Sequence, residues 1–582
     1  MLKWLIAALG LVLSAPRAHA DAAAEFRAIV ADYDAFARAA DPIRAASRGD
    51  AAAARLWPDN SPAAVAARAA ALRALSARLD AVGGLPAAEA MERAILVYRL
   101  QDASDGAAFD EERVPFISGE GFFANPDYAA TLTVLRSRAD AEAWLARLEA
   151  IPAYYERETA NMRRAIGTRF TQPALVVRNT IRGVRAQAAI PSEESPLMAP
   201  LGRLPDAIPE TERRALRARG AEIYHTRIVP ALAALGDFLE RDYLPAARPR
   251  LGVRSLPGGA RYYEYLVRKH TTTRLTPAQV HALGVAEVAR VRSEMEAVIR
   301  ESNFSGSFAE FIAFLRSDPQ FYPRDAVELE RITSEVANRA NLALPRYFAV
   351  LPRNTYGITF IPSALETGSA GYWPGNLAQG APGQVLLRRT TAERRSLYDL
   401  PAWVLHEGSP GHHTQIALAE EIEGLPDYRR SDDITAFVEG WALYAERLGE
   451  EMGIYRTPYE RFGRLSMEMW RACRLVIDTG VHWMGWSRER AVACLRDNSA
   501  LTQSEIEREV DRYIGWPGQA LAYKVGEIEI RDLRARAERT LGACFDLRAF
   551  HDALLSAGAL PMAVLRTRME GWTATRACPA AS

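Results

Sequence analysis

The sequence predicts a mostly helical fold, a large helical body with one small antiparallel β-sheet beside a deep cleft. Apolar residues recur at helical spacing through Ala-, Leu- and Arg-rich text over most of the 582 residues. Over residues 346–390 the pattern changes to short β-type runs separated by Pro, Gly and Asn. No period of repeat length recurs, which argues against a regular solenoid. We therefore expect one domain over residues 21–582, with an N-terminal helical part over 21–270 and a second part over 271–582 that contains the sheet.

Helices are predicted on both sides of this sheet. Before it, Thr276 is placed to cap a helix whose first position suits Pro277, and helical spacing continues through residues 280–299. The sheet itself is predicted from the three runs YFAVL, YGITFI and QVLLRR. After Pro401 the helical pattern returns and continues almost to the C-terminus.

The composition is that of a globular protein with no excess of either charge. Hydrophobic residues make up 49% of the chain, which excludes the disordered class, and 38 Gly with 33 Pro are too few for a collagen-like or low-complexity chain. Lys+Arg and Asp+Glu both number 72, so there is no basic surplus to gather phosphates. We therefore expect no nucleic-acid partner.

Residues 1–20 are typical of a secretory signal peptide. Lys3 precedes an apolar run from Trp4 to Ala15, and Ala18-His19-Ala20 fits the small-x-small pattern of a cleavage site. The run is too short to span a bilayer, and no cysteine follows the cleavage site to carry a lipid. The sequence thus predicts a periplasmic protein that begins near Asp21 and keeps no membrane anchor.

The four cysteines lie within the last 110 residues of the chain. Export would take them to an oxidising space, where disulfides are permitted. Of the three possible pairings we favour the sequence-local one, Cys473 with Cys494 and Cys544 with Cys578. The alternative is four buried thiols with no bridge.

Three of the nine histidines fall in one string of eight residues, HEGSPGHH. The string follows the predicted sheet and opens a helical run, which is where metal hydrolases carry the HExxH motif. In that motif two histidines four residues apart hold Zn²⁺ from one helix face, and the Glu beside the first acts as base on the metal-bound water. The corresponding residues here are His406, Glu407 and either His412 or His413.

The spacing of these histidines does not fit an uninterrupted helix. His406 and His412 are six residues apart, roughly 240° around the axis, and His413 returns to the first face about 10.5 Å further along. Pro410 cannot donate to the carbonyl of His406, and with Gly411 it should break or bulge the helix. A bulged turn would place His412 beside His406 and form a metal site. The alternative is a capped helix junction that carries solvent histidines.

A third ligand for a catalytic zinc is expected on the next predicted helix, AFVEGWALYAERLGEEM. Glu439 stands there among apolar residues, and a buried carboxylate needs a cation or a proton as its partner. Glu446 is seven residues further on and shares the same helix face, so it could support a ligand. The alternative for Glu439 is a salt bridge to one of the many arginines.

Four motifs follow one another along the chain, HEGSPGHHTQ, FVEGWALYAE, RACRLVIDTGVHWMGW and PGQALAYKVG. In these motifs the sequence resembles the bacterial domain-of-unknown-function-885 family, whose members are predicted zinc metallopeptidases akin to the gluzincins. The resemblance covers most of the mature chain, because YYEYLVRKHTTTRLTPAQVHALG and SFAEFIAFLRSDPQFYP also match the family's pattern.

Carried over residue by residue, the resemblance implies that His406 and His412 bind the metal, that Glu407 is the base and that Glu439 is the third ligand. The family pattern HE-x-x-P-G-H favours His412 over His413, which remains a candidate supporting residue. Because the family departs from plain HExxH, the ligand geometry of that motif is not transferred.

The last two motifs supply the remaining candidates. Arg474, Asp478 and His482 are spaced four apart and line one predicted helix face, for which the alternative is an ion pair beside a satisfied histidine. Gln519 and Tyr523 are also four apart and follow Pro-Gly. We expect these residues to support the site or to bind substrate.

A gluzincin-like enzyme needs a donor for the oxyanion that forms when water attacks a carbonyl. Tyr523 and His482 are the predicted donors. Arg474 or Lys524, one of only two lysines in the predicted mature chain, could pair with a substrate carboxylate. The alternative for Lys524 is an ordinary surface lysine.

Together these residues predict an exported hydrolase that holds one Zn²⁺ per chain and cleaves peptide or small amide bonds. A strand edge within residues 346–390 could hold an extended peptide. Two alternatives stay open, a zinc enzyme that acts on a non-peptide amide or ester and a metal-free periplasmic binding or scaffold protein. The choice between exo- and endo-cleavage and the oligomeric state also stay open.

Overall fold

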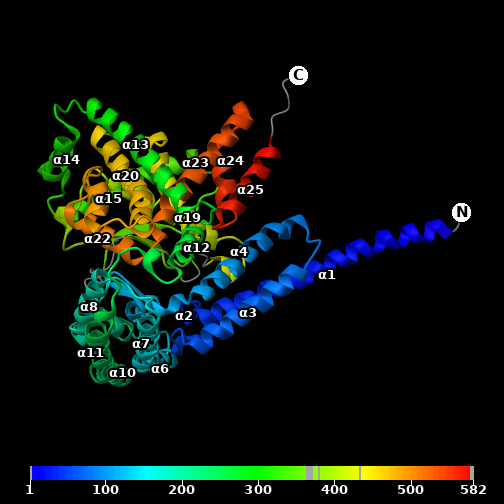
Figure 1. The fold of residues 1–582 in the computed structure, drawn as a ribbon, viewed down its shortest axis with the longest axis horizontal. Helices are drawn as coiled ribbons and strands as arrows, with labels where there is room; N and C mark the ends of the chain where they lie inside the picture. Colours follow the sequence, from blue (N-terminus) through cyan, green and yellow to red (C-terminus); the bar gives the residue numbers. More distant parts are fainter. Residues whose placement is uncertain (1–2, 362–370, 378–379, 431–433, 577–582) are drawn as a thin grey trace. The chain divides into compact units, whose positions relative to one another are not determined.

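Helices dominate the computed structural model, which confirms the prediction of a mostly helical fold (Figure 1). The structure describes residues 3–361, 371–377, 380–430 and 434–576. Its contacts divide the chain into two units, Met1–Arg248 with Pro426–Ser431 and Pro249–Leu425 with Asp432–Ser582. All candidate site residues belong to the second unit.

The first unit combines helices with one short antiparallel hairpin. Its strands are β1 (Phe116–Ile117) and β2 (Glu120–Gly121). Its α-helices are α1 (Lys3–Ala40), α2 (Pro42–Ser47), α3 (Pro62–Ala81), α4 (Ala87–Phe109), α5 (Asn125–Leu132), α6 (Arg138–Glu149), α7 (Ile151–Thr168), α8 (Ala174–Ala188), α9 (Ala199–Gly202), α10 (Glu210–Ile223), α11 (Val229–Phe238) and α18 (Asp427–Arg430).

Helices α1, α3 and α4 share a small core of leucines and aromatic rings, which includes Phe26, Leu79 and Leu96. The short helix α18 joins this unit although it lies far along the chain, because the buried guanidinium of Arg429 pairs with Glu92 of α4 at 2.6 Å. Residues 3–20 of the predicted signal peptide fall within α1. Over the residues that the structure describes, no helix is both long and apolar enough to cross a bilayer.

The second unit combines helices with a three-stranded sheet. Its strands are β3 (Tyr356–Phe360), β4 (Gly371–Trp373) and β5 (Gly383–Leu387). Its α-helices are α12 (Gly259–Thr271), α13 (Pro277–Glu301), α14 (Phe308–Ser317), α15 (Ala326–Ala343), α16 (Leu400–Glu407), α17 (His412–Glu420), α19 (Thr435–Glu451), α20 (Pro458–His482), α21 (Arg488–Arg496), α22 (Gln503–Gly515), α23 (Ala522–Leu541), α24 (Leu547–Leu555) and α25 (Met562–Ala574).

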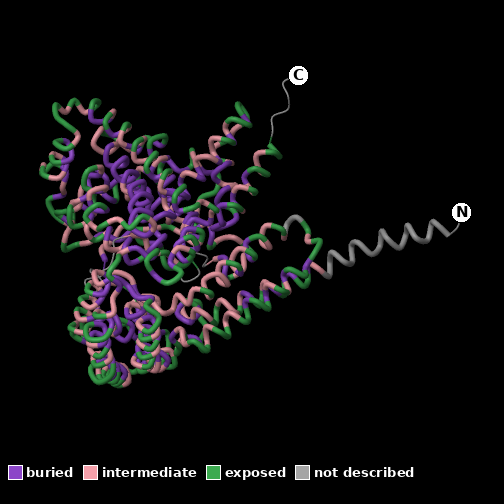
Figure 2. Tube along the Cα trace, in the orientation of Figure 1, coloured by how far each residue is buried: buried purple, intermediate pink, exposed green. Residues whose placement is uncertain are grey.

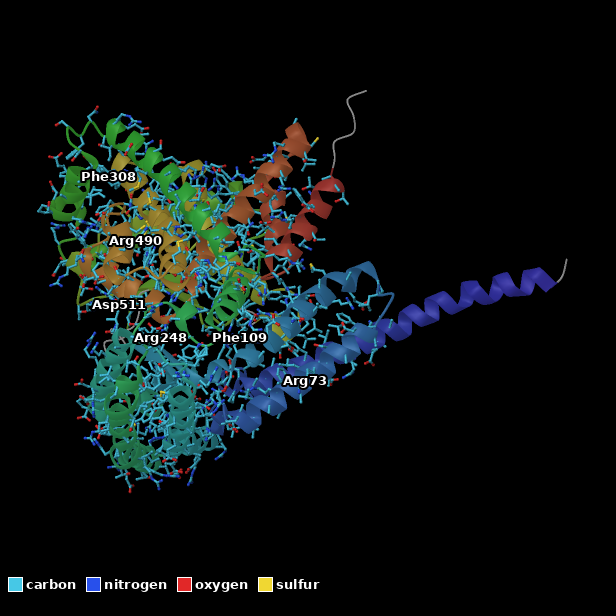
Figure 3. All side chains as sticks on the ribbon, in the orientation of Figure 1. Arg73, Phe109, Arg248, Phe308, Arg490 and Asp511 are labelled. Atoms are coloured by element: carbon cyan, nitrogen blue, oxygen red, sulfur yellow. The ribbon has the colours of Figure 1, made fainter. Side chains whose placement is uncertain are left out.

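Helix α20 runs through the interior of this unit. From Phe462 to its end at His482 nearly every residue is buried, polar ones included (Figure 2). Helices α13, α21 and α22 pack against it. Arg490 and Asp511 mark α21 and α22 in Figure 3, and Arg488 links the two helices by an ion pair to Asp511 at 2.6 Å. The capped start of α13 at Thr276 and Pro277 is confirmed.

The sheet differs from the predicted antiparallel one. Its strand order is β3-β5-β4, with β5 parallel to β3 and antiparallel to β4. The run YFAVL is not a strand, because its backbone amides have other acceptors. Tyr347 and Phe348 donate to the carbonyl of Leu344 in a helical turn, and the amides of Ala349 and Val350 both reach the Asp552 carboxylate.

Helices α19 and α23 approach so closely that main chain meets main chain. A Cβ on Gly440 of α19 would lie 2.5 Å from the carbonyl carbon of Gly526. A Cβ on Gly526 would lie 1.8 Å from the carbonyl oxygen of Ala436. Only glycine therefore fits at either position, and the contact brings Glu439 on one helix near Tyr523 on the other.

The cysteines of α20 and α21 lie side by side without a bond between them. Cys473 and Cys494 are free thiols whose sulfurs are 3.1 Å apart, so the predicted bridge between them is not formed. Cys544 is disulfide-bonded. Its predicted partner Cys578 lies outside the described residues.

Candidate metal centre

The histidines of the HEGSPGHH string lie on two separate helices. After α16 the chain turns sharply, and the amide of Gly411 donates back to the carbonyl of Leu405 at 3.0 Å. A Cβ on Gly411 would lie 2.1 Å from the carbonyl oxygen of His406, so the turn admits only glycine. The predicted interruption at Pro410 and Gly411 is confirmed. It brings the rings of His406 and His412 to a centroid distance of 4.7 Å.

Helix α19 fixes this turn and supplies a third group. The indole N–H of Trp441 donates to the carbonyl of Pro410 at 2.8 Å. Two residues earlier, Glu439 directs its Oε2 atom at both histidines, 3.4 Å from His406 Nε2 and 3.6 Å from His412 Nε2. The structure thus brings together the three residues predicted as metal ligands.

The spacing of these three groups fits a shared metal ion. One donor atom from each lies within 4.8 Å of the others. The separations of 3.4 and 3.6 Å are long for charge-assisted hydrogen bonds, whereas ligands at about 2.1 Å from a tetrahedral zinc stand about 3.4 Å apart. Glu439 Oε2 is buried and makes no hydrogen bond to any described residue. A buried carboxylate oxygen of this kind requires a cation.

The electrostatics of the cluster also favour a cation. Burial lowers the pKa of His406, but Glu439 and Glu446 outweigh burial and raise this pKa to about 9. Burial raises the pKa of Glu439, and the two histidines outweigh it, so this pKa lies well below its usual range. The carboxylates therefore attract positive charge strongly, and a divalent ion and a proton on His406 compete for the same place.

Glu446 orients the first histidine. His406 Nδ1 lies 2.8 Å from Glu446 Oε1, and the guanidinium of Arg471 faces the same oxygen at 3.4 Å. In the neutral ring an Nδ1–H that donates to Glu446 leaves the unprotonated Nε2 to face Glu439 and the centre of the cluster, so an ion that displaces the second proton meets a free nitrogen. Glu446 was predicted as a supporting residue, and Arg471 was not.

Glu407 follows His406 on the side of the sheet. Its carboxylate faces Gly371 of β4, where a Cβ would lie 3.7 Å from Glu407 Oε2. Among the described residues no hydrogen bond or ion pair engages this carboxylate, and the residue is partly exposed. A carboxylate in this condition is available to accept a proton from water beside the centre.

His413 turns away from the cluster toward the sheet. Its Nδ1 atom lies 3.0 Å from the hydroxyl of Tyr372, and its ring packs on Tyr356 at a centroid distance of 4.6 Å. Burial lowers the pKa of His413 to about 4, so the ring is neutral at physiological pH. His413 thus contacts the sheet, whereas His412 faces Glu439.

Tyr523 stands at the start of α23, beside the same cluster. Burial raises the pKa of its phenol and the nearby Glu439 carboxylate raises it further, while the guanidinium groups of Arg474 and Arg512 act in the opposite direction. The residue is partly exposed. A phenol that keeps its proton next to the metal ligand is placed to donate to an oxyanion.

Arg474 and Asp478 lie on α20 and contact the segment around Tyr523. The guanidinium of Arg474 stacks over the ring of Tyr523 at 4.1 Å and donates to the Tyr513 hydroxyl at 2.8 Å. Asp478 accepts from Tyr263 at 2.6 Å and from the amide of Gly518 at 3.0 Å. Asp478 therefore holds the turn that precedes Gln519, and it does not pair with Arg474.

His482 has a different role from the predicted one. Both ring nitrogens of His482 are engaged, because Nδ1 accepts from the amide of Val253 at 3.3 Å and Nε2 lies 2.8 Å from the carbonyl of Tyr513. His482 is fully buried, and no N–H remains for an oxyanion. The expected oxyanion role of His482 does not fit this geometry.

Lys524 is neither a surface lysine nor free to bind substrate. Its side chain is fully buried, and its ammonium lies 3.0, 2.7 and 2.8 Å from Glu287, Glu468 and Glu527. These three glutamates are also close enough to bind a metal, but the lysine occupies the space between them. The three N–H groups have three partners, so this cluster is an internal ion network.

The sequence reasoning missed the contribution of α22. Glu509, Arg512 and Tyr513 of this helix surround Arg474 and Gln519. Glu509 and Arg512 are three residues apart and form an ion pair at 3.0 Å, a spacing that the sequence displays. Nothing in the sequence indicated that this pair would face α20.

Comparison with known proteins adds a family and a fold. Residues 42–569 match the model of a family described as "Bacterial protein of unknown function (DUF885)". A solved structure described as a "putative lipoprotein" from Colwellia psychrerythraea is similar at 23% identity and a TM-score of 0.87, covering 95% of this chain and 99% of that one. A second, a "putative lipoprotein of unknown function" from Shewanella oneidensis, gives 20% identity, a TM-score of 0.69 and coverages of 94% and 99%. No curated protein matches the sequence significantly.

Proposed function

The chain belongs to the DUF885 family, and we propose that it is an exported zinc-dependent hydrolase that cleaves peptide bonds. The observation that carries this proposal is the arrangement of His406, His412 and Glu439. They come from three helices, they converge at ligand spacing, and the glutamate oxygen between the histidines has no hydrogen-bond partner among the described residues. Two histidines and one carboxylate are the ligands of many catalytic zinc sites.

When bound, Zn²⁺ would supply Lewis acidity toward a carbonyl and lower the pKa of water at the site. The residues of the chain would do the rest. Glu407 would take a proton from the attacking water and return it to the leaving amine, so it needs to be near the centre without being a ligand. Its open carboxylate beside His406 supports this role.

Tyr523 would donate a hydrogen bond from its phenolic hydroxyl to the oxyanion as the carbonyl becomes tetrahedral, and it would keep its proton. The contact with the guanidinium of Arg474 holds the phenol ring in place. Glu446 would keep His406 in the tautomer that presents Nε2 to the ion. The short strand β4, at an edge of the sheet and against Glu407, could pair with an extended peptide.

Export is proposed from two kinds of support. The first twenty residues have the charge, apolar run and small-residue pattern of a signal peptide. Two similar solved structures are of proteins described as putative lipoproteins, a class of exported proteins. On this support we propose that the mature protein is periplasmic.

The test is a metal and activity measurement on the purified mature protein. We expect about one zinc per chain by elemental analysis, and hydrolysis of members of a mixed peptide library followed by mass spectrometry. Chelation should abolish hydrolysis, and added zinc should restore it. Protein that binds no zinc, or that cleaves peptides equally well after the metal is removed, would contradict the proposal. A zinc protein that cleaves amide or ester compounds but no peptide would favour the non-peptide alternative.

A further inference from the structure

Next to the metal centre, we propose that Arg474 and Arg512 form a subsite for a carboxylate group of the substrate. The inference rests on the proposed hydrolase function and narrows its substrates to peptides that carry a negative charge near the bond that is cleaved.

The guanidinium of Arg474 is only partly paired. Its Nε donates to Tyr513 and its Nη2 lies 3.2 Å from Glu509 Oε2. The remaining nitrogen, Nη1, is buried and has no partner among the described residues. The side chain as a whole is 4% exposed. A buried N–H of a charged group that lacks an acceptor is costly, so the structure has a donor that awaits one.

The charges around Arg474 do not balance. Glu509 Oε2 accepts from Arg474 at 3.2 Å and from Arg512 at 3.0 Å, so one carboxylate serves two guanidinium groups. Asp478, one turn further along the same helix, is buried, and burial raises its pKa to about 7, so it carries only part of a negative charge near neutral pH. The cluster therefore carries about one unpaired positive charge in a mostly buried place.

Another buried arginine of the same helix shows what full pairing looks like. Arg464 is 6% exposed and faces Glu294, Glu450 and Glu468 at 3.7, 3.0 and 2.6 Å. Lys524 likewise has three glutamates. A purely structural role for Arg474 is served by its contacts with aromatic rings, but it does not explain why Arg474 shares a single carboxylate.

The two arginines of the proposed subsite lie next to Tyr523, which stands beside the candidate metal centre. Arg512 donates to Gln519 at 2.9 Å, one turn before Tyr523, and Arg474 lies over the Tyr523 ring at 4.1 Å. A substrate whose carbonyl oxygen reaches the Tyr523 hydroxyl would therefore bring its neighbouring groups to the two arginines. Guanidinium groups recognise carboxylates by paired hydrogen bonds.

Two substrate groups have this chemistry, a free C-terminal carboxylate and the side chain of Asp or Glu. Four matched peptides separate them. Each hit from the library is made in four forms: the free acid, its C-terminal amide, the free acid with Asp and Glu changed to Asn and Gln, and the amide with the same side-chain changes. The kcat/KM of the protein is then measured for each form. If amidation lowers kcat/KM by about 10- to 100-fold, the subsite binds the C-terminal carboxylate. If the change of Asp and Glu to Asn and Gln lowers kcat/KM by the same factor, the subsite binds an acidic side chain.

Variants then assign the effect to the arginines. In Arg512→Gln and Arg474→Gln the ratio of kcat/KM between acid and neutral peptides should fall toward one. A purely structural role would lower kcat/KM for both peptides alike and leave the ratio unchanged. Arg508→Gln, on an exposed face of α22, is the matched control and should keep both values. Arg512 is 19% exposed, so its variant should fold even if the Arg474 variant does not.

Binding provides a second measurement that needs no turnover. Calorimetry with Glu407→Gln protein should show about 10- to 100-fold tighter binding of acid peptides than of their neutral partners. Equal kcat/KM and equal binding for acid and neutral peptides would overturn the subsite while leaving the hydrolase proposal intact. If the unmodified protein cleaves nothing, the hydrolase proposal fails, and a binding preference for acids that is lost in Arg512→Gln would still support the subsite.

Discussion

His406 Nδ1 lies 2.8 Å from Glu446 Oε1, and both groups are buried. The pair joins α16 to α19, and it fixes which nitrogen of the histidine faces Glu439. A ligand histidine that is held in this way pays less entropy when an ion binds, and its ring is more basic.

Replacing Glu446 should therefore weaken the metal site without removing a ligand. We expect Glu446→Gln to raise the Kd for zinc by about 10- to 100-fold, measured by competition with a coloured chelator. Glu450→Gln is the control, because Glu450 is one turn further along α19 and pairs with Arg464. If Glu446→Gln bound zinc as tightly as the unmodified protein, the orienting role would be wrong.

Neighbouring histidines offer a matched pair for the ligand assignment. His412→Ala should lower the zinc content well below one per chain, whereas His413→Ala should keep it, since His413 contacts Tyr372 and Tyr356 instead. Elemental analysis of the two purified variants decides the question. The reverse result, an empty His413 variant and a full His412 variant, would contradict the arrangement described for the turn.

The proposed chemistry separates Glu407 from the ligands. Glu407→Gln should retain zinc and lose turnover by about 10³ to 10⁴, because it keeps the shape of the side chain and removes the base. Tyr523→Phe should also retain zinc and lose about 10² or more, since one oxyanion donor disappears. Both are measured as kcat on a library hit. A Glu407→Gln protein that cleaves as fast as the unmodified one would exclude this mechanism.

The internal ion network predicts a large effect on stability. Lys524→Met leaves Glu287, Glu468 and Glu527 without the ammonium between them, and we expect a loss of about 3 to 5 kcal/mol in the free energy of unfolding. Lys269→Met, at the other lysine of the predicted mature chain, should change it by less than about 1 kcal/mol. Urea denaturation of both variants gives the comparison. Equal stabilities would mean that the network contributes nothing.

Asp478 should make the stability depend on pH. Burial raises its pKa to about 7, above the value of about 3.9 in an unfolded chain. The folded protein therefore holds this proton more tightly, and the stability that Asp478 contributes is complete below about pH 4 and lost as the pH rises to about 7. Asp478→Asn cannot ionise and should lack this loss. The difference in unfolding free energy between variant and unmodified protein should grow by about 3 to 4 kcal/mol across this interval, and a constant difference would contradict the assignment.

Much of the fold follows from local signals in the sequence. The cap at Thr276, the helices on both sides of the sheet and the break at Pro410 and Gly411 each depend on a few adjacent residues. The pairing of the strands does not follow from local signals. Each short run indicates a strand, but nothing local states that β5 takes the centre between β3 and β4, or that Asp552 claims the amides of Ala349 and Val350.

The residues of the candidate site could likewise be predicted only in part. His406, His412, Glu439 and Glu446 could be proposed because each has a recognisable neighbour in the sequence. Spacing along α20 placed His482 and Arg474 near one helix face, but it gave no information about what packs there. Val253 and Tyr513 engage both nitrogens of His482, while Tyr523 and Glu509 contact Arg474. The rarity of Lys524 drew attention to it, yet its three glutamates come from distant parts of the chain.

The glycine contact between α19 and α23 also determines how the centre can change. Gly440 follows the proposed ligand Glu439, and Gly526 is one turn beyond Tyr523, so the gap between the Glu439 carboxylate and the phenol is set by main-chain atoms, which have no rotamers. Ordinary interiors suffer most when a large side chain is made small. Here the reverse holds, because one added methyl at either glycine would push two helices apart and change the distance between the parts of the site. Variation in this protein would then have to leave that gap fixed and act through residues around it, such as those of α22.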